Sequence, residues 1–115
     1  MEFSRGDVVL VLFPDSNLRT AKRRPAVVIQ PDKLQTGLSQ TIIAMISSNL
    51  ARSSHPSRVL VTKASATGVQ MGIHSDSVVM TDNIATVQEN EIDRKIGTCS
   101  NLFAINVAIR VTLGL

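Results

Sequence analysis

Short apolar runs, rich in β-branched residues and separated by turn-forming residues, recur along most of the chain. Each run has the length and composition of a strand, and a cluster of Pro, Gly, Asp, Asn or Ser follows most of them. Five or six strands this close together predict a mainly β fold, a small antiparallel barrel formed by a single domain over residues 1–115. The expected strands cover residues 8–13, 25–30, 41–47, 58–62, 76–80 and 83–87.

The C-terminal segment carries two competing patterns. The first is helical spacing of apolar residues, at Leu102, Ile105, Ile109 and Leu113. The second is strict alternation, since every second residue from Phe103 onward is apolar, as in a strand. A segment of about twelve residues is long for a strand in so small a barrel, so length favours a C-terminal α-helix. Ser100 or Asn101 would be its N-cap.

Composition narrows the class of protein. Of the 115 residues, 43% are hydrophobic and 18% are charged, as in ordinary globular domains. No apolar run approaches the length of a membrane span, and the first residues lack a signal-peptide pattern. The single Cys99 cannot form an internal disulfide, and with His55 and His74 it provides no metal-binding spacing. The sequence predicts a cytoplasmic protein without a metal or other cofactor.

The charge is unevenly distributed. Residues 1–63 contain nine Lys and Arg against four Asp and Glu, whereas the rest of the chain contains three against five. A basic half indicates an anionic partner, either nucleic acid or an acidic protein segment.

The densest basic cluster is Lys22-Arg23-Arg24, which runs directly into Pro25 and an apolar stretch. We expect the basic residues on a loop and Pro25 at the first position of a strand, where no ladder donor is needed. The residue before a proline is restricted to extended geometry, which partly fixes the direction of Arg24. A guanidinium held this way is suited to binding phosphate. A solvated, inert charge cluster is the alternative.

Four segments, in this order and spacing, resemble the MazF/PemK family of toxin endoribonucleases. They are Arg5-Gly6-Asp7-Val8, Arg24-Pro25-Ala26-Val27-Val28-Ile29, Met45-Ile46-Ser47-Ser48, and Asp76-Ser77-Val78-Val79 continuing to Ala85-Thr86-Val87. The resemblance implies an SH3-like β-barrel with a C-terminal helix, usually a homodimer. It also implies the toxin of a type II toxin–antitoxin pair, a sequence-specific and metal-independent endoribonuclease that cleaves single-stranded RNA or mRNA. An antitoxin partner would hold it inactive.

The family's arginine in its Arg-Pro motif maps to Arg24, and its hydroxyl residue at the end of the third strand, usually Thr, maps to Ser47. Cleavage by the ribose 2′-OH gives a 2′,3′-cyclic phosphate and a 5′-OH, and needs in-line orientation and stabilisation of a charged phosphorane. We assign phosphorane stabilisation to Arg24, because a guanidinium is a poor proton donor. Ser47 keeps the hydroxyl but loses the methyl that restricts its rotation. Alternatively, Ser47 is a strand-end serine bonded to its own backbone.

Asp82 matches an acidic position that some members use near the scissile phosphate, although a turn residue between two strands is the favoured explanation. Some members have arginines where this chain has Met80 and Ala85, so two positive charges are missing. Arg5, in the Arg-Gly-Asp segment, is expected to be structural. His55 could act as a general base, though the family match does not require it, and His74 is a weaker candidate.

RNA binding would use loop side chains, since the chain has no Trp or Tyr and its three Phe lie in apolar contexts. The expected RNA-binding residues are Arg19, Lys22, Arg23, Ser48, Asn49 and Arg52. An antitoxin with an acidic C-terminal segment would occupy the basic groove between loops 15–24 and 48–57.

Two non-catalytic readings remain. One is a gyrase poison of the CcdB type, a relative with the same fold, although this chain lacks the tryptophan found near the C-terminus of those proteins. The other is a degenerate toxin homologue that binds RNA or protein without cleaving it.

Overall fold

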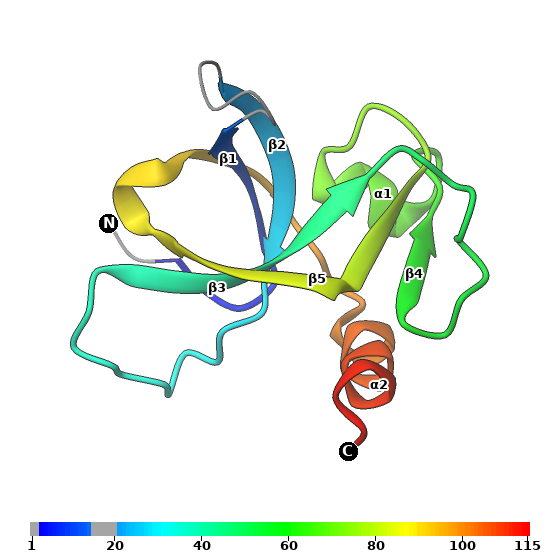
Figure 1. Cartoon of the computed structure of the whole chain (residues 1–115). Coiled ribbons are helices and arrows are strands. Elements are labelled where there is room, and N and C mark those ends of the chain that lie inside the picture. The colour runs from blue at the N-terminus through cyan, green and yellow to red at the C-terminus, as the bar shows by residue number, and fades with distance from the viewer. Residues whose placement is uncertain (1–2, 15–20) are drawn as a thin grey trace.

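The computed structural model describes residues 3–14 and 21–115. One six-stranded antiparallel sheet with two helices forms the molecule (Figure 1). The strands are β1 (Asp7–Pro14), β2 (Ala21–Val28), β3 (Gln40–Ser47), β4 (Arg58–Val61), β5 (Ser77–Gln88) and β6 (Ile92–Thr98). The two α-helices are α1 (Ala66–Met71) and α2 (Leu102–Leu113), and a short 3₁₀ turn, η1 (Glu89–Glu91), lies between β5 and β6.

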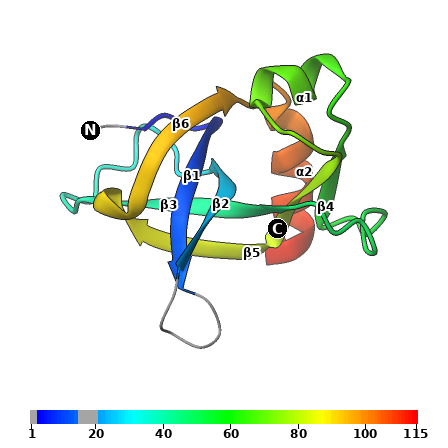
Figure 2. The same ribbon diagram turned by 90° about the horizontal axis from the view of Figure 1, so that it is seen from above.

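The sheet is strongly bent but open. Its strand order is β4-β5-β3-β2-β1-β6, so β4 and β6 are the two edges. Strands β1 and β2 cross the line of β3 and β5 (Figure 2). The mainly β class and the C-terminal helix are therefore confirmed, whereas the described strands do not close into the expected complete barrel.

Two apolar clusters hold the sheet in this shape. The first, which includes Val8, Val27, Met71 and Ile105, joins the sheet to both helices. The second, which includes Val9, Val28 and Ile43, lies on the opposite side of the same strands. Strand β1 contributes to both clusters, and this explains why its sequence is apolar at consecutive positions instead of alternating.

Helix α2 begins with one of the two expected N-cap residues and ends at a glycine. The side chain of Asn101 accepts a hydrogen bond from the backbone N–H of Ala104, and Gly114 closes the helix in the left-handed conformation. Only part of the expected apolar face is buried, however. Ile105 is buried, Leu102 and Ile109 pack partly buried against the first cluster, and Leu113 is exposed.

Four elements differ from the sequence-based expectations. Strand β2 begins at Ala21, so the basic cluster lies on a strand and not on a loop. Strand β5 is continuous where two strands were expected, because residues 81–83 form a bend within it. Strand β6 and helix α1 were missed. The centre of β6 is the polar run Asp93-Arg94-Lys95, and α1 is only six residues long, too short to show helical periodicity.

Candidate active site

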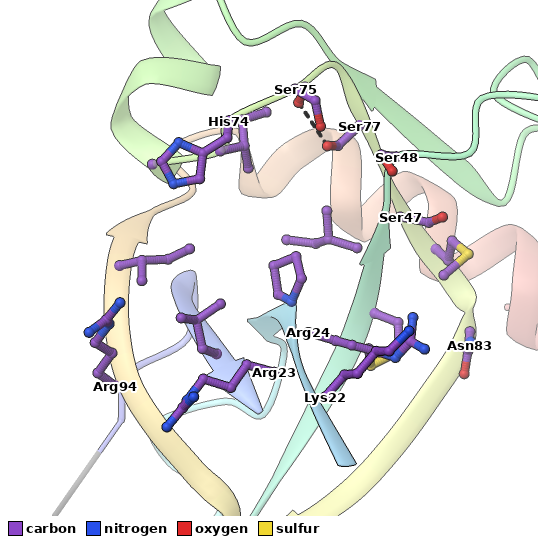
Figure 3. Close-up of a pocket in the computed structure, with 18 residues that line it drawn as sticks. Lys22, Arg23, Arg24, Ser47, Ser48, His74, Ser75, Ser77, Asn83 and Arg94 are labelled. Carbon is purple, nitrogen blue, oxygen red and sulfur yellow. Dashed lines mark hydrogen bonds between the residues drawn. The ribbon is translucent and has the colours of Figure 1, made fainter. Parts of the chain in front are cut away.

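A cavity of about 730 Å³ opens between β2, β3, β6 and the segment that joins α1 to β5 (Figure 3). Its polar lining comes from Lys22, Arg23, Arg24, Ser47, Ser48, His74, Ser75, Ser77, Asn83 and Arg94. Apolar side chains, including Leu10, Met45 and Ile96, complete the wall. The sequence predictions for Arg24, Ser47, Lys22, Arg23 and Ser48 therefore meet in one place.

Pairing of β2 with β1 positions the basic cluster. Arg23 lies opposite Leu12 and Arg24 opposite Val11. Strand β3 pairs with β2 only from Ala26 onward, so Pro25 lies where β2 has one neighbour. A strand tolerates the missing N–H of proline at such a place. The expectation that Pro25 begins the strand was wrong, but Arg24 is held by the sheet more firmly than a loop residue would be.

Ser47 is the last residue of β3, and it pairs with Val78 of β5. Its Oγ accepts a hydrogen bond from the backbone N–H of Asn49 at 3.1 Å. This bond is the local backbone contact that the structural alternative predicted. It uses one lone pair of the oxygen and leaves the hydroxyl hydrogen available for donation to a ligand.

The bend in β5 separates two neighbouring side chains. The register with β3 jumps from Met45 opposite Met80 to Ala44 opposite Ile84, so residues 81–83 are extra. Asn83 lines the cavity, whereas Asp82 forms an ion pair with Arg58 at 3.3 Å and is not among the lining residues. Bulges of this kind often redirect side chains next to functional sites.

The remaining predicted residues lie elsewhere. In His55, Nδ1 lies 2.7 Å from Oγ of Ser57, and neither His55 nor Arg52 lines the cavity. The side chain of Asn49 accepts a hydrogen bond from the backbone N–H of Ala51 and is also outside the lining. Arg19 lies outside the described residues.

The polar lining also includes residues that the sequence analysis did not predict as ligands, among them His74, Asn83 and Arg94. His74 follows α1 on a loop, and Arg94 belongs to the polar strand β6. The carboxylate of Asp93 lies 3.2 Å from Nε of Arg23 and 3.9 Å from Nε of Arg94, so it holds two of the arginines. Of these three residues, only His74 is a candidate from the sequence, as a weak general base.

The electrostatic character of the cavity is cationic. Four Lys and Arg side chains are among its described lining residues, and no Asp or Glu is. Met80 lines the cavity and Ala85 packs against the second apolar cluster, at the positions where some MazF/PemK proteins have arginine. Arg94 supplies a positive charge from a different strand. The arrangement can bind phosphate groups and donate hydrogen bonds to them.

Other chemistry-bearing groups are not at this site. Cys99 is buried in the first apolar cluster, where burial raises the pKa of its thiol and opposes nucleophilic behaviour. In the described part of the chain, His, Cys, Asp and Glu do not gather in threes as a metal site would require. None of the helices in residues 3–14 and 21–115 combines the length and apolarity needed to cross a membrane.

Residues 4–114 match a family model described as PemK-like, MazF-like toxin of type II toxin–antitoxin systems. The chain belongs to this toxin family. The resemblance drawn from the four sequence segments is therefore confirmed over almost the whole chain.

Individual relatives agree with the family assignment. The chain is 29% identical over 114 residues to the Endoribonuclease MazF of Staphylococcus saprophyticus, covering 96% of this chain and 91% of the relative. It is 31% identical over 99 residues to the Endoribonuclease MazF6 of Mycobacterium tuberculosis, covering 84% and 82%. The fold resembles a solved mycobacterial endoribonuclease in complex with its cognate antitoxin, with a TM-score of 0.73, 18% identity and coverage of 99% and 97%.

Proposed function

We propose that this PemK/MazF-family chain is the toxin of a type II toxin–antitoxin pair and that it cleaves single-stranded RNA at the cationic cavity. The observation that carries the proposal is the meeting of Arg24 from β2 and Ser47 from β3 in one cavity whose described lining has no carboxylate. Both residues occupy the family's motif positions. A polyanion can enter such a cavity without electrostatic repulsion from its walls.

The reaction is an internal transesterification. The ribose 2′-oxygen forms a bond to phosphorus while the bond from phosphorus to the 5′-oxygen breaks, giving a 2′,3′-cyclic phosphate and a 5′-OH. Arg24 would stabilise the negative charge that develops on the phosphorane. The Ser47 hydroxyl, whose oxygen is oriented by the Asn49 N–H, would donate a hydrogen bond to a phosphate or leaving-group oxygen. Asp82 and His55 have no part in this proposal.

Lys22, Arg23 and Ser48 would guide the RNA backbone along the cavity. Their charges and hydroxyl lie beside Arg24 and Ser47 in the lining. Arg52 and Asn49 remain predicted contacts for more distant nucleotides, since both lie on the loop after β3.

The partner that inhibits this reaction would be an antitoxin with an acidic C-terminal segment. The carboxylates of such a segment can replace RNA phosphates on Arg24, Lys22 and Arg94, all of which line the cavity. Toxin and antitoxin would act in the cytoplasm, where mRNA is available.

A second copy of this chain is the occupant we propose for the exposed apolar face of α2 and β4. Phe103 is 78% exposed, and Leu60 and Val107 line a shallow groove beside it. A homodimer through this face would bury these side chains, and Phe103→Ser should shift the protein from dimer to monomer in sedimentation analysis.

The decisive experiment incubates the purified protein with single-stranded RNA in EDTA and determines the chemistry of the new ends. Cleavage that leaves 5′-OH and cyclic-phosphate ends is the expected result. Replacing the nucleotide before the cleaved bond with its 2′-deoxy form should abolish cleavage, because the nucleophile is then missing. Intact RNA that remains bound would overturn the proposal in favour of a non-catalytic binding protein.

A further inference from the structure

We propose that the far end of the cavity is a nucleotide subsite in which His74 stacks on the base next to the cleaved bond and sets the sequence preference there. Arg94 and Arg23 would bind the phosphate on the outer side of that nucleotide. This inference rests on the proposed function, because it assumes that RNA occupies the cavity.

Two ends of the cavity can be distinguished. We call the part of the lining with Lys22, Arg24, Ser47 and Asn83 the reactive end, and the part with His74 and Arg94 the distal end. Figure 3 shows His74 and Arg94 on the opposite side of the cavity from Arg24 and Ser47. A cavity of about 730 Å³ exceeds what one phosphate group needs, and it lies within the roughly 300–1,000 Å³ typical of pockets for larger organic ligands.

Two glycines fix the distal end by letting α1 approach β6 at backbone distance. A Cβ on Gly72, which ends α1 with φ +73°, would collide with the carbonyl oxygen of Ile96. A Cβ on Gly97 would collide with the backbone of Gln70 and Met71. The loop that carries His74 therefore emerges from a fixed point against the strand that carries Arg94.

Hydrogen bonds hold the remainder of this loop. The backbone N–H of Lys63 donates to Asp76 Oδ1 at 2.9 Å, and Ser77 Oγ donates to the carbonyl oxygen of Ser75 at 2.8 Å. His74 thus lies between an anchored glycine and an anchored turn. A ring presented from a restrained backbone loses less entropy on binding than one on a free loop.

The chemistry of the distal end suits a base. Among the described residues that line the cavity, His74 carries the only aromatic ring, and Ile73 and Ile96 provide apolar surface near it. Bases splayed from single-stranded RNA commonly stack on such rings. Phe103 lies on the outer face, and Phe3 packs against the second apolar cluster, so neither is available here.

The outer phosphate has a prepared binding site. Oδ2 of Asp93 lies 3.2 Å from Nε of Arg23 and 3.9 Å from Nε of Arg94, so the two arginines share one carboxylate oxygen as a neighbour. An RNA phosphodiester has two non-bridging oxygens, which can accept hydrogen bonds from both guanidinium groups.

The test of base stacking uses a random-sequence RNA pool and sequencing of the cleaved ends. The wild type should show a preference at each position near the cleaved bond. His74→Ala should flatten the preference at one position adjacent to that bond and lower kcat/KM about tenfold, mainly through KM. His74→Phe restores a ring and should recover most of the kcat/KM, with a changed preference at the same position.

His55→Ala is the matched control, because it removes the other imidazole of the chain from a loop outside the cavity. Its cleavage profile should equal that of the wild type. An unchanged profile and KM in a folded His74→Ala protein would overturn the subsite while leaving the proposed function intact. Absence of any RNA cleavage by the wild type would overturn both.

The phosphate contact has a separate readout. Arg94→Ala should weaken binding of a 2′-deoxy oligonucleotide and reduce the salt dependence of that binding by about one phosphate contact. Arg110→Ala, which removes an exposed charge from the last turn of α2, should leave the salt dependence unchanged. If binding of the oligonucleotide depended equally on salt concentration in the Arg94→Ala and wild-type proteins, Arg94 would be excluded from the subsite.

Discussion

The reactive and distal ends of the cavity are built in different ways. Arg24 and Ser47 are positioned by strand pairing, β2 with β1 and β3 with β5, and the same pairing forms the apolar core. His74 is positioned by the contact of α1 with β6 through Gly72 and Gly97, whereas Arg94 is positioned by its place in β6, opposite Leu10 of β1. A change in the loop after α1 can alter the distal end without moving the sheet. In the proposed mechanism, the sheet therefore positions the residues assigned to chemistry, and the contact of α1 with β6 positions the ring assigned to sequence preference.

The largest expected effect is at the reactive end. Arg24→Ala should lower kcat for RNA cleavage by about 10²- to 10³-fold, the range found for loss of one donor to a developing oxyanion. Single-turnover cleavage of a defined oligonucleotide measures it. Lys33→Ala removes an equal charge from an exposed loop outside the cavity and should change kcat less than twofold. Similar losses of kcat in the two variants would show that Arg24 acts only through general electrostatic attraction of the RNA.

The contact between α1 and β6 can be broken with Gly72→Ala. The alanine would have to adopt a positive φ, and its Cβ would collide with the Ile96 carbonyl oxygen. We therefore expect the free energy of unfolding to fall by about 3 kcal/mol. Gly37→Ala is the control, since Gly37 has φ +78° but open space around its Cα, and about 1 kcal/mol is expected. Urea denaturation compares them. Equal losses would show that backbone conformation alone, and not close packing, requires Gly72.

Ser47 gives an intermediate effect. Ser47→Ala should lower kcat about tenfold, because it removes the donor and leaves the Asn49 N–H without its partner. Ser47→Thr restores the hydroxyl with a restricted rotamer and should equal or exceed the wild type. The ratio of the two rates in the oligonucleotide assay isolates the hydroxyl. If Ser47→Ala were fully active, Ser47 would have only a structural role, as a strand-end serine that bonds the local backbone.

The same contrast explains how much the sequence could predict. Local patterns and the family motifs were enough for the mainly β class and the C-terminal helix, whereas the strand expected to begin at Pro25 begins at Ala21. Part of the sheet could not be predicted, because the charged runs Lys22-Arg23-Arg24 and Asp93-Arg94-Lys95 lack the apolar alternation of a strand. Both runs nevertheless belong to strands that pair with β1. The length of β5 was missed because residues 81–83 interrupt its pattern.

The distal end was beyond sequence reasoning for a different physical reason. The place of His74 depends on two glycines far apart in the chain, Gly72 and Gly97, whose missing side chains allow one backbone to approach another. Neither glycine carries a local signal of that contact. Similarly, no sequence pattern indicates that the side chain of Asp82 pairs with Arg58 and does not turn toward Arg24.

The smallest expected effect concerns Asp82, which lies beside the reactive end in sequence but faces Arg58. Asp82→Asn should change kcat less than twofold, because the carboxylate does not line the cavity. Loss of a partly exposed ion pair should cost less than about 1 kcal/mol of stability, measured by urea denaturation. Asn83→Ala is the matched neighbour, since Asn83 does line the cavity and should affect KM more. A tenfold loss of kcat in Asp82→Asn would instead place this carboxylate in the reaction and extend the reactive end around the bend of β5.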